Sequence, residues 1–270
     1  MNLLADPRTR ATRRALVSLV AFALLWELGA RSKAWFGVAV PWVGHVPPPS
    51  AVLAAWVRLL GDPGYWQSWV ASLLRVLAGF TAAMAVGIPL GLLLAMNRVC
   101  RMIFFPVLEL LRPIPPLAWV PAAILFWPTQ ELSIAFVTFV GAFFTIVLNV
   151  VGGAGAIDVR YFQAARAMGA TGWNVFRRVV LPATVPAIVV GAAVGMGITW
   201  EVVVAAEMIS GGGSSGATGG GMGFFIWNSY IGGAYEQIVV GMISIGIAGY
   251  ACSEALRRLG ARVTPWLVRA

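Results

Sequence analysis

Charged residues are scarce in this chain of 270 residues: they make up 11% of it, whereas hydrophobic residues make up 60%. A soluble domain usually has about a quarter of its residues charged. The scarcity of charge therefore excludes an ordinary soluble domain. Long apolar runs, rather than short alternating ones, predict an all-α, polytopic membrane protein.

Histidine and cysteine are also nearly absent. His45 is the only histidine, which excludes a metal site built from several histidines, and the two cysteines are Cys100 and Cys252. Both cysteines fall near predicted cytoplasmic ends of spans, where a disulfide is not expected. No nucleophile–base set is evident, and the glycine-rich run 211–221 lacks the Gly-Lys-Ser/Thr ending of a phosphate-binding loop. We therefore expect no enzyme activity, no metal and no cofactor on this chain itself.

Basic residues exceed acidic ones, 19 against 10, for a net charge of +9. They cluster in short loops beside apolar runs, which indicates membrane topology and not nucleic-acid binding. The predicted spans are 15–30, 68–96, 102–127, 132–151, 183–209 and 238–255. With the N-terminus inside, 14 basic residues fall in the inner segments and three in the outer ones. This asymmetry predicts six spans with both termini cytoplasmic.

One membrane domain over 1–270 is expected, because no linker or internal repeat is evident. It would comprise an N-terminal anchor with an outer segment, 1–67, and a core, 68–257. In the outer segment, Ser50 follows three prolines and is predicted to cap an amphipathic helix, 51–60, on the membrane surface.

The longest polar segment with helical character is 158–182, between two apolar spans. Asp158 can cap a helix over 159–168, and Gly169 can end that helix in a left-handed conformation. Thr171 is a second candidate cap, for a helix over 173–180, and Pro182 marks the turn into the next span. The segment is therefore predicted to be an ordered loop of two short helices.

This loop resembles the signature of permease subunits of ABC importers, which reads E-A-A, three residues, G, nine residues, I, any residue, L-P. The matching residues are Gln163, Ala164, Ala165, Gly169, Val179, Leu181 and Pro182. Gln163 departs from the usual acid, and Val179 departs from isoleucine. In the family the loop docks into a cytoplasmic ATPase subunit. The resemblance therefore implies that Gln163, Ala164, Ala165, Gly169, Leu181 and Pro182 couple the chain to an ATPase.

Further stretches, such as PPPSAVLAAWVRLL, LRPIPPLAWVPAAILFW and AAEMI, resemble the nitrate/sulfonate/taurine branch of these permeases. This resemblance implies a type I ABC importer fold with a cytoplasmic coupling-helix loop, in a bacterial inner membrane. It also implies a small oxyanion as substrate, of the nitrate, taurine or alkanesulfonate type. The implied partners are ATPase subunits that carry ATP and Mg, an extracytoplasmic substrate-binding protein, a second copy of this chain, and membrane lipid.

The third predicted span is interrupted by Pro113, Pro115 and Pro116, about 16 Å from Arg101 at 1.5 Å per residue. Irregular backbone at that depth is tolerated only where it is buried in protein or lines a watery cavity. A half-helix from Leu117 would direct its positive end into the break, and Arg112 adds a full charge there. These groups suit an oxyanion. Alternatively, Arg112 pairs with Glu109 or Glu201 and stabilises the kink.

Seven residues are candidates for the translocation pathway: Arg75, Arg112, Pro115, Pro116, Trp119, Glu201 and Glu207. Arg75 lies about two turns into its span and either reaches the outer interface by snorkelling or contacts substrate. Glu201 and Glu207 are intramembrane acids, which mark functional sites, pair with Arg112 or Arg75, or lie in water at the outer end. Trp119 either lines the pathway or serves packing.

Two other functions remain open. An ion-gradient-driven secondary transporter would work without an ATPase and would usually show an internal repeat. A non-transporting membrane scaffold subunit would tolerate a change at Gly169.

Overall fold

The computed structural model describes residues 7–32, 35, 37, 41, 43–209 and 220–267, and within them every regular element is a helix. The predicted glycine-rich run lies largely outside these residues, as do Lys33 and Arg269 of the predicted charge count. The chain divides into two compact units, which are described separately. The first contains residues 1–65 and 226–243, and the second contains 66–225 and 244–270.

The first unit contains α1 (Pro7–Ala30), a 3₁₀ turn (Val43–His45) and α3 (Pro49–Leu59), together with the ends of longer helices. The amphipathic helix predicted at 51–60 is therefore present as α3. The prediction that Ser50 caps this helix is wrong, because Ser50 lies inside its first turn. Its backbone N–H and its hydroxyl instead donate to the Glu27 carboxylate of α1, at 3.0 and 2.8 Å. Glu27 thus satisfies a donor that a helix start leaves free.

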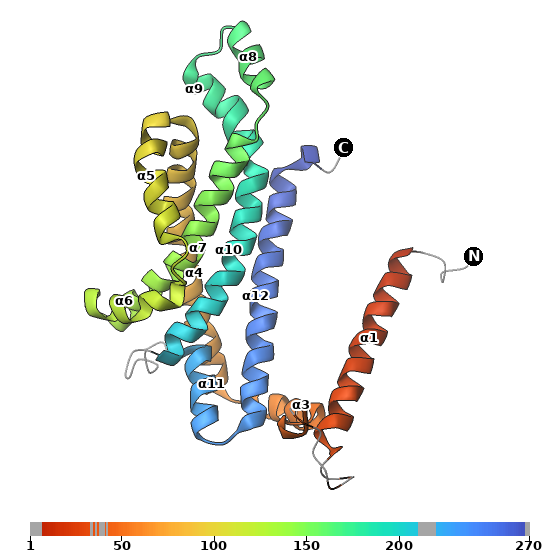
Figure 1. The fold of residues 1–270 in the computed structure, drawn as a ribbon. Coiled ribbons are helices and arrows are strands. Elements are labelled where there is room, and N and C mark those ends of the chain that lie inside the picture. The colour runs from red at the N-terminus through yellow and green to blue at the C-terminus, as the bar shows by residue number, and fades with distance from the viewer. Residues whose placement is uncertain are drawn as a thin grey trace. The chain divides into compact units, whose positions relative to one another are not determined.

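Four long helices organise the second unit: α4 (Pro63–Met96), α7 (Gln130–Gly155), α10 (Leu181–Ile209) and α12 (Tyr235–Val263), of which α4 and α12 begin in the first unit. The shorter elements are α5 (Arg98–Leu111), a 3₁₀ turn (Pro116–Trp119), α6 (Val120–Phe126), α8 (Val159–Ala167), α9 (Gly172–Val175), a π-helical turn (Phe176–Val180), α11 (Gly221–Ile231) and a 3₁₀ turn (Pro265–Leu267). Residues 226–231 of α11 belong to the first unit. Figure 1 shows α8 and α9 beyond the ends of α7 and α10.

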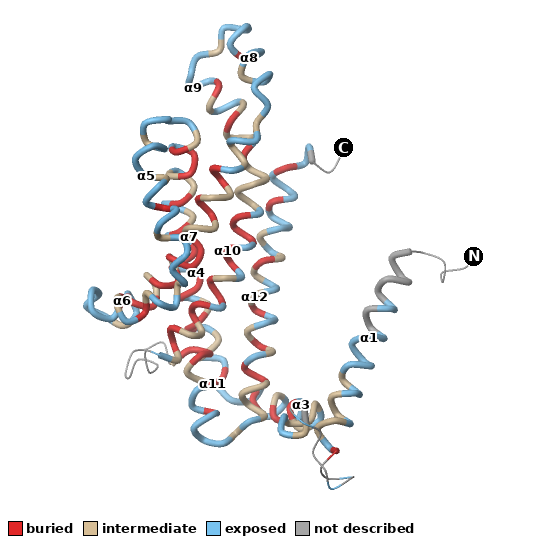
Figure 2. Tube along the Cα trace, in the orientation of Figure 1, coloured by how far each residue is buried: buried red, intermediate tan, exposed pale blue. Residues whose placement is uncertain are grey.

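The core of the second unit lies along α7 and α10, where buried positions follow one another along both helices (Figure 2). Glycines allow the close packing. A Cβ at Gly191 of α10 would lie 2.7 Å from the Cβ of Asn149 on α7. A Cβ at Gly91 of α4 would lie 2.7 Å from the Cβ of Val150. Small residues at helix contacts are typical of membrane proteins, because lipid supplies no hydrophobic drive for helix association.

Among the described residues, four helical stretches are long and apolar enough to cross a membrane: Pro63–Met96, Gln130–Gly155, Gly172–Ile209 and Tyr235–Val263. They match the predicted second, fourth, fifth and sixth spans. The predicted first span falls in α1, whose apolar part, Val17–Ala30, is shorter than these. Its crossing of the membrane stays a prediction.

The predicted interruption of the third span is confirmed. Helix α5 ends at Leu111, and the chain resumes helical structure at Pro116 after a bend of 92°. The pair counts as one further span if the two halves cross together. The bend follows from the prolines, which remove backbone donors and disfavour helical geometry in the residues before them.

Candidate functional site

Helix α8, the first helix of the loop, begins and ends as its sequence predicts. Asp158 is the N-cap, and its carboxylate accepts the N–H of Arg160 at 2.8 Å. At the other end, Gly169 has φ +76° and its N–H donates to the carbonyl of Arg166 at 2.9 Å, while Ala170 N–H donates to the carbonyl of Ala165 at 3.0 Å. This pair of bonds is a Schellman motif, which requires the left-handed conformation at the position of Gly169.

The second helix of the loop differs from its prediction. Thr171 occupies the N-cap position, but its side chain makes no capping hydrogen bond. The helix does not stop near Val180: α9 continues through the π-helical turn into α10, and Gly172–Ile209 is one unbroken helical stretch. The prediction that the chain turns at Pro182 is therefore wrong. The π turn, in which Leu181 N–H bonds to the carbonyl of Phe176, directly precedes the proline that cannot donate.

The signature residues lie before, within and after the π-helical turn. Gln163 and Ala164 are exposed on α8, whereas Ala165 is buried against the core. Large apolar side chains on the same loop are also exposed, namely Val159, Tyr161, Met168 (82% exposed) and Trp173. Figure 2 shows that the loop lies beyond the ends of α7 and α10 and that most of it is exposed. An exposed apolar patch of this kind is typical of a surface that binds another protein.

A second polar cluster lies inside the second unit, around Arg75 of α4. Its side chain is 6% exposed, and its guanidinium contacts two carboxylates. Glu131, at the start of α7, is 52% exposed and accepts two hydrogen bonds from Arg75, at 2.8 and 2.5 Å. Glu207 of α10 is fully buried and accepts one at 2.9 Å. The prediction that Arg75 reaches the interface by snorkelling is wrong, and the pairing of Glu207 with Arg75 is confirmed.

The same cluster holds the beginning of α11. Its first free donors are paired: Gly223 N–H donates to Glu207 at 2.9 Å, and Met222 N–H donates to the hydroxyl of Ser72 at 2.8 Å. The Ser72 hydroxyl in turn donates to the Glu207 carboxylate at 2.8 Å. Gly221 has φ +80°, and a Cβ there would collide with that carboxylate. A buried carboxylate therefore caps α11 from another helix.

Arg112 lies elsewhere in the second unit, at the break after α5. It lines a cavity of about 300 Å³ with Ile114 and Pro116 of the break, Thr145 and Asn149 of α7, and Ile198 of α10. The predicted pairing of Arg112 with Glu109 or Glu201 is wrong, because its side chain has no ion pair or hydrogen bond to any residue that the structure describes. Arg112, without a partner among the described residues, thus lines a small cavity at an interruption of a membrane helix.

Of the predicted pathway residues, Arg112 and Pro116 line this cavity, and Glu201, Trp119 and Pro115 do not. Glu201 is exposed on α10, one helical turn beyond the cavity-lining Ile198. Trp119 packs edge-on against Phe136, with ring centroids 6.4 Å apart, as its packing alternative predicts. Pro115 precedes the 3₁₀ turn that begins at Pro116.

Sequence reasoning missed three residues of these clusters. Glu131 and Ser72 hold the Arg75 cluster together, and Asn149 contributes an amide beside Arg112. Only Glu131 carried a signal, since an acid at the start of an apolar span is unusual in a chain with ten acids.

The fold and these sites define a class: a polytopic α-helical membrane protein with a small cavity at a broken span and a protruding helical loop. The comparison with known families agrees. The chain belongs to the family "Binding-protein-dependent transport system inner membrane component", which matches residues 87–269. It is therefore a multi-pass inner-membrane permease component of an ABC importer. The prediction of a single domain over 1–270 stays a prediction.

Three curated relatives show the same relationship. The nitrate import permease protein NrtB of Synechocystis is 31% identical over 93% of this chain and 89% of its own length. The taurine transport system permease protein TauC of Escherichia coli is 30% identical over 82% of this chain and 80% of its own. The bicarbonate transport system permease protein CmpB of Synechococcus elongatus is 34% identical over 76% of this chain and 70% of its own.

Two solved structures share the fold. One is the MetNI methionine ABC transporter in an inward-facing conformation, at a TM-score of 0.57 and 24% identity, covering 77% of this chain and 97% of that chain. The other is a bacterial ABC transporter involved in the import of alginate, at a TM-score of 0.57 and 14% identity, covering 96% of this chain and 100% of that chain. The type I importer permease fold is thereby confirmed.

Proposed function

We propose that this chain is the membrane-spanning subunit of an ATP-driven importer that carries a small oxyanion and is moved by separate ATPase subunits. In this proposal both termini and the loop 158–182 face the cytoplasm, two copies of the chain enclose the pathway, and an extracytoplasmic binding protein delivers the substrate. ATP and Mg belong to the ATPase subunits.

The proposal rests on the structure of the loop. Helix α8 presents an exposed apolar surface, the Schellman motif at Gly169 fixes α8 relative to α9, and α9 is continuous with the membrane helix α10. A force on α8 therefore acts on α10 through a hydrogen-bonded turn at Gly169 and then through continuous helical backbone from Gly172. This is the geometry that a coupling element needs, because helices transmit displacement with little deformation.

The substrate class rests on the cavity beside Arg112. Arginine presents a rigid set of donors that matches planar or tetrahedral oxyanions. The relatives named for nitrate, taurine and bicarbonate transport carry substrates with an oxyanion group in common. We therefore propose nitrate, a sulfonate such as taurine, or bicarbonate as candidate substrates. Arg112 and Asn149 would provide their polar contacts, and Ile114 and Ile198 would exclude water.

The test is purification of the tagged chain from its native membrane in mild detergent, with the ATPase activity of the eluate measured. Gly169→Val disturbs the Schellman motif, since valine is strained at positive φ. Gly155→Val is the matched control. Gly155 is the last residue of α7, its φ is not positive, and an added Cβ there meets nothing within 4 Å.

We expect an ATPase subunit in equal copy number with the wild-type chain and with Gly155→Val, and its loss or inactivity with Gly169→Val at equal membrane insertion. A wild-type chain that is recovered alone and inactive would contradict the proposal, as would a Gly169→Val chain that keeps an active, coupled ATPase.

A further inference from the structure

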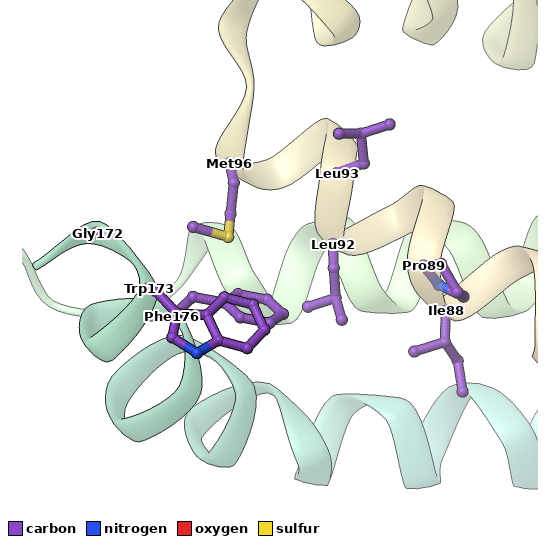
Figure 3. A pocket seen from close by; sticks show the side chains of 8 residues that line it. All are labelled: Ile88, Pro89, Leu92, Leu93, Met96, Gly172, Trp173 and Phe176. Atoms are coloured by element: carbon purple, nitrogen blue, oxygen red, sulfur yellow. The ribbon is translucent and has the colours of Figure 1, made fainter.

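An apolar groove separates the end of α4 from the second helix of the loop. Its volume is about 570 Å³. Ile88, Leu92 and Met96 form the α4 wall, and Trp173 and Phe176 form the other. In Figure 3 the Met96 side chain is directed at the two rings, and Leu92 and Ile88 point into the space beside them. The rings of Trp173 and Phe176 pack together, with centroids 5.4 Å apart.

The chemistry of the lining defines what can fill the groove. Seven of its eight lining residues have apolar side chains and the eighth is Gly172, so the only polar side-chain group in the lining is the indole N–H of Trp173. Nothing in the wall offers a carboxylate, amide or hydroxyl to fix a polar ligand. A hydrocarbon chain is therefore the group that matches the lining, through van der Waals contact with its apolar side chains.

The depth of the groove matches one half of a membrane. Its α4 wall runs from Ile88 to Met96 at the end of a helix that is long and apolar enough to span a bilayer. Eight steps along a helix cover about 12 Å, and half of the hydrocarbon core of a bilayer is about 15 Å thick. The groove therefore runs along most of the depth of one leaflet.

Two basic residues, unpaired within the described part of the chain, lie next to groove-lining residues in the sequence. Arg98 follows Met96 by two positions, and Arg177 follows Phe176 directly. Both are exposed, and neither forms an ion pair within the described part of the chain. Basic side chains beside a membrane helix attract anionic headgroups.

We infer that this groove is a binding site for an anionic phospholipid of the cytoplasmic leaflet, with an acyl chain between α4 and Trp173 and the headgroup beside Arg98 and Arg177. The inference rests on the proposed function in one respect, since that function places this end of α4 at the cytoplasmic surface. The bound chain would support Trp173 and Phe176, which belong to the same continuous helix as α10. The lipid thereby becomes part of the element that couples the ATPase to the membrane.

Native mass spectrometry of the chain, released from nanodiscs of phosphatidylethanolamine with one-fifth phosphatidylglycerol, measures retained lipid without any transport assay. Leu92→Trp fills the groove, and Leu77→Trp is its control, at an exposed position of α4 about 22 Å from Leu92 by helix rise. The double variant Arg98→Gln/Arg177→Gln removes charge without altering the packed interior. Arg262→Gln, on the exposed end of α12, is its control.

We expect wild type and both controls to retain phosphatidylglycerol in preference to phosphatidylethanolamine. Leu92→Trp should lose this lipid, and the double variant should hold it more than tenfold less tightly, at about fivefold for each arginine near an anionic surface. Equal retention by all chains, or no preference in wild type, would overturn the inference.

The two proposals fail separately. Loss of phosphatidylglycerol binding with an intact ATPase response to Gly169→Val would leave the importer in place and remove only the lipid site. Specific lipid binding by a chain that recovers no ATPase would leave the lipid site in place and contradict the importer.

Discussion

Arg75, Glu131 and Glu207 show how single charges are accommodated inside a membrane domain. Moving one charge into a low-dielectric interior costs several kcal/mol unless partners compensate. Here one guanidinium contacts two carboxylates, and the more deeply buried carboxylate also accepts a backbone N–H and a serine hydroxyl. The charge of Arg75 is thereby paired, whereas Arg112 has no such partner among the described residues. The two arginines consequently have different expected roles.

Glu207→Gln should therefore destabilise the protein. The substitution removes the fully buried partner of Arg75 and weakens the cap of α11, at a cost on the order of 3 kcal/mol. Glu201→Gln, on the same helix at an exposed position, is expected to leave the stability of the protein unchanged. The thermal midpoint of the purified chain in detergent measures the difference. Equal midpoints for the two variants would contradict a structural role for Glu207.

Arg112→Gln should leave stability unchanged and weaken the response to substrate. Loss of a charged hydrogen bond to an anion predicts an approximately tenfold or greater increase in the anion concentration that half-maximally stimulates ATP hydrolysis. Glu109→Gln, one turn away, is the control. A drop in folded protein with an unchanged concentration dependence would instead assign Arg112 a structural role.

Helix ends determine how the elements of this chain connect. Three are stabilised by side chains from outside the helix itself or by special backbone: Glu27 at α3, the Glu207 cluster at α11, and the Schellman motif at Gly169. At α11 the geometry leaves no space for a Cβ, because Gly221 adjoins the Glu207 carboxylate. The position of α11 thus depends on one glycine and one buried acid.

Gly221→Ala should displace the start of α11. The left-handed conformation costs alanine about 1–2 kcal/mol, and the added methyl also collides with Glu207. Hydrogen exchange at the first turn of α11 should rise, while exchange in α7 stays unchanged. Gly246→Ala in α12, where an added Cβ meets nothing within 4 Å, is the control. Unchanged exchange in Gly221→Ala would show that Glu207 does not fix α11.

Local signals in the sequence predicted most of the fold, and tertiary pairing was the part that they could not supply. The prolines after Arg112 and the cap and glycine of α8 act within a few residues, so their effects are readable from spacing. Arg75 and Glu207 are separated by 132 residues, and only the packing of α4 on α10 brings them together. The predicted turn at Pro182 is absent because a π turn beside it lets the helix continue. Ser50 misled the prediction because its partner, Glu27, comes from another helix.

At the scale of the whole molecule, the cavity at the broken span and the loop 158–182 are connected through α7 and α10. Ile198 and Asn149 line the cavity, and the helices that carry them, α10 and α7, pack on each other along their length. The two helices also flank the loop, which connects them in the chain. A displacement of the loop is therefore expected to change the shape of the cavity, as alternating access requires.

Anion uptake by proteoliposomes tests this claim most directly. They would contain the chain with the ATPase and binding protein that copurify with it, and uptake would be compared between Gly169→Val and Gly155→Val. ATP-dependent uptake of nitrate, taurine or bicarbonate is expected with Gly155→Val, and little or no uptake is expected with Gly169→Val, because its ATPase subunit is lost or inactive. Uptake at the wild-type rate in Gly169→Val, or uptake driven by an ion gradient without ATP, would contradict this claim.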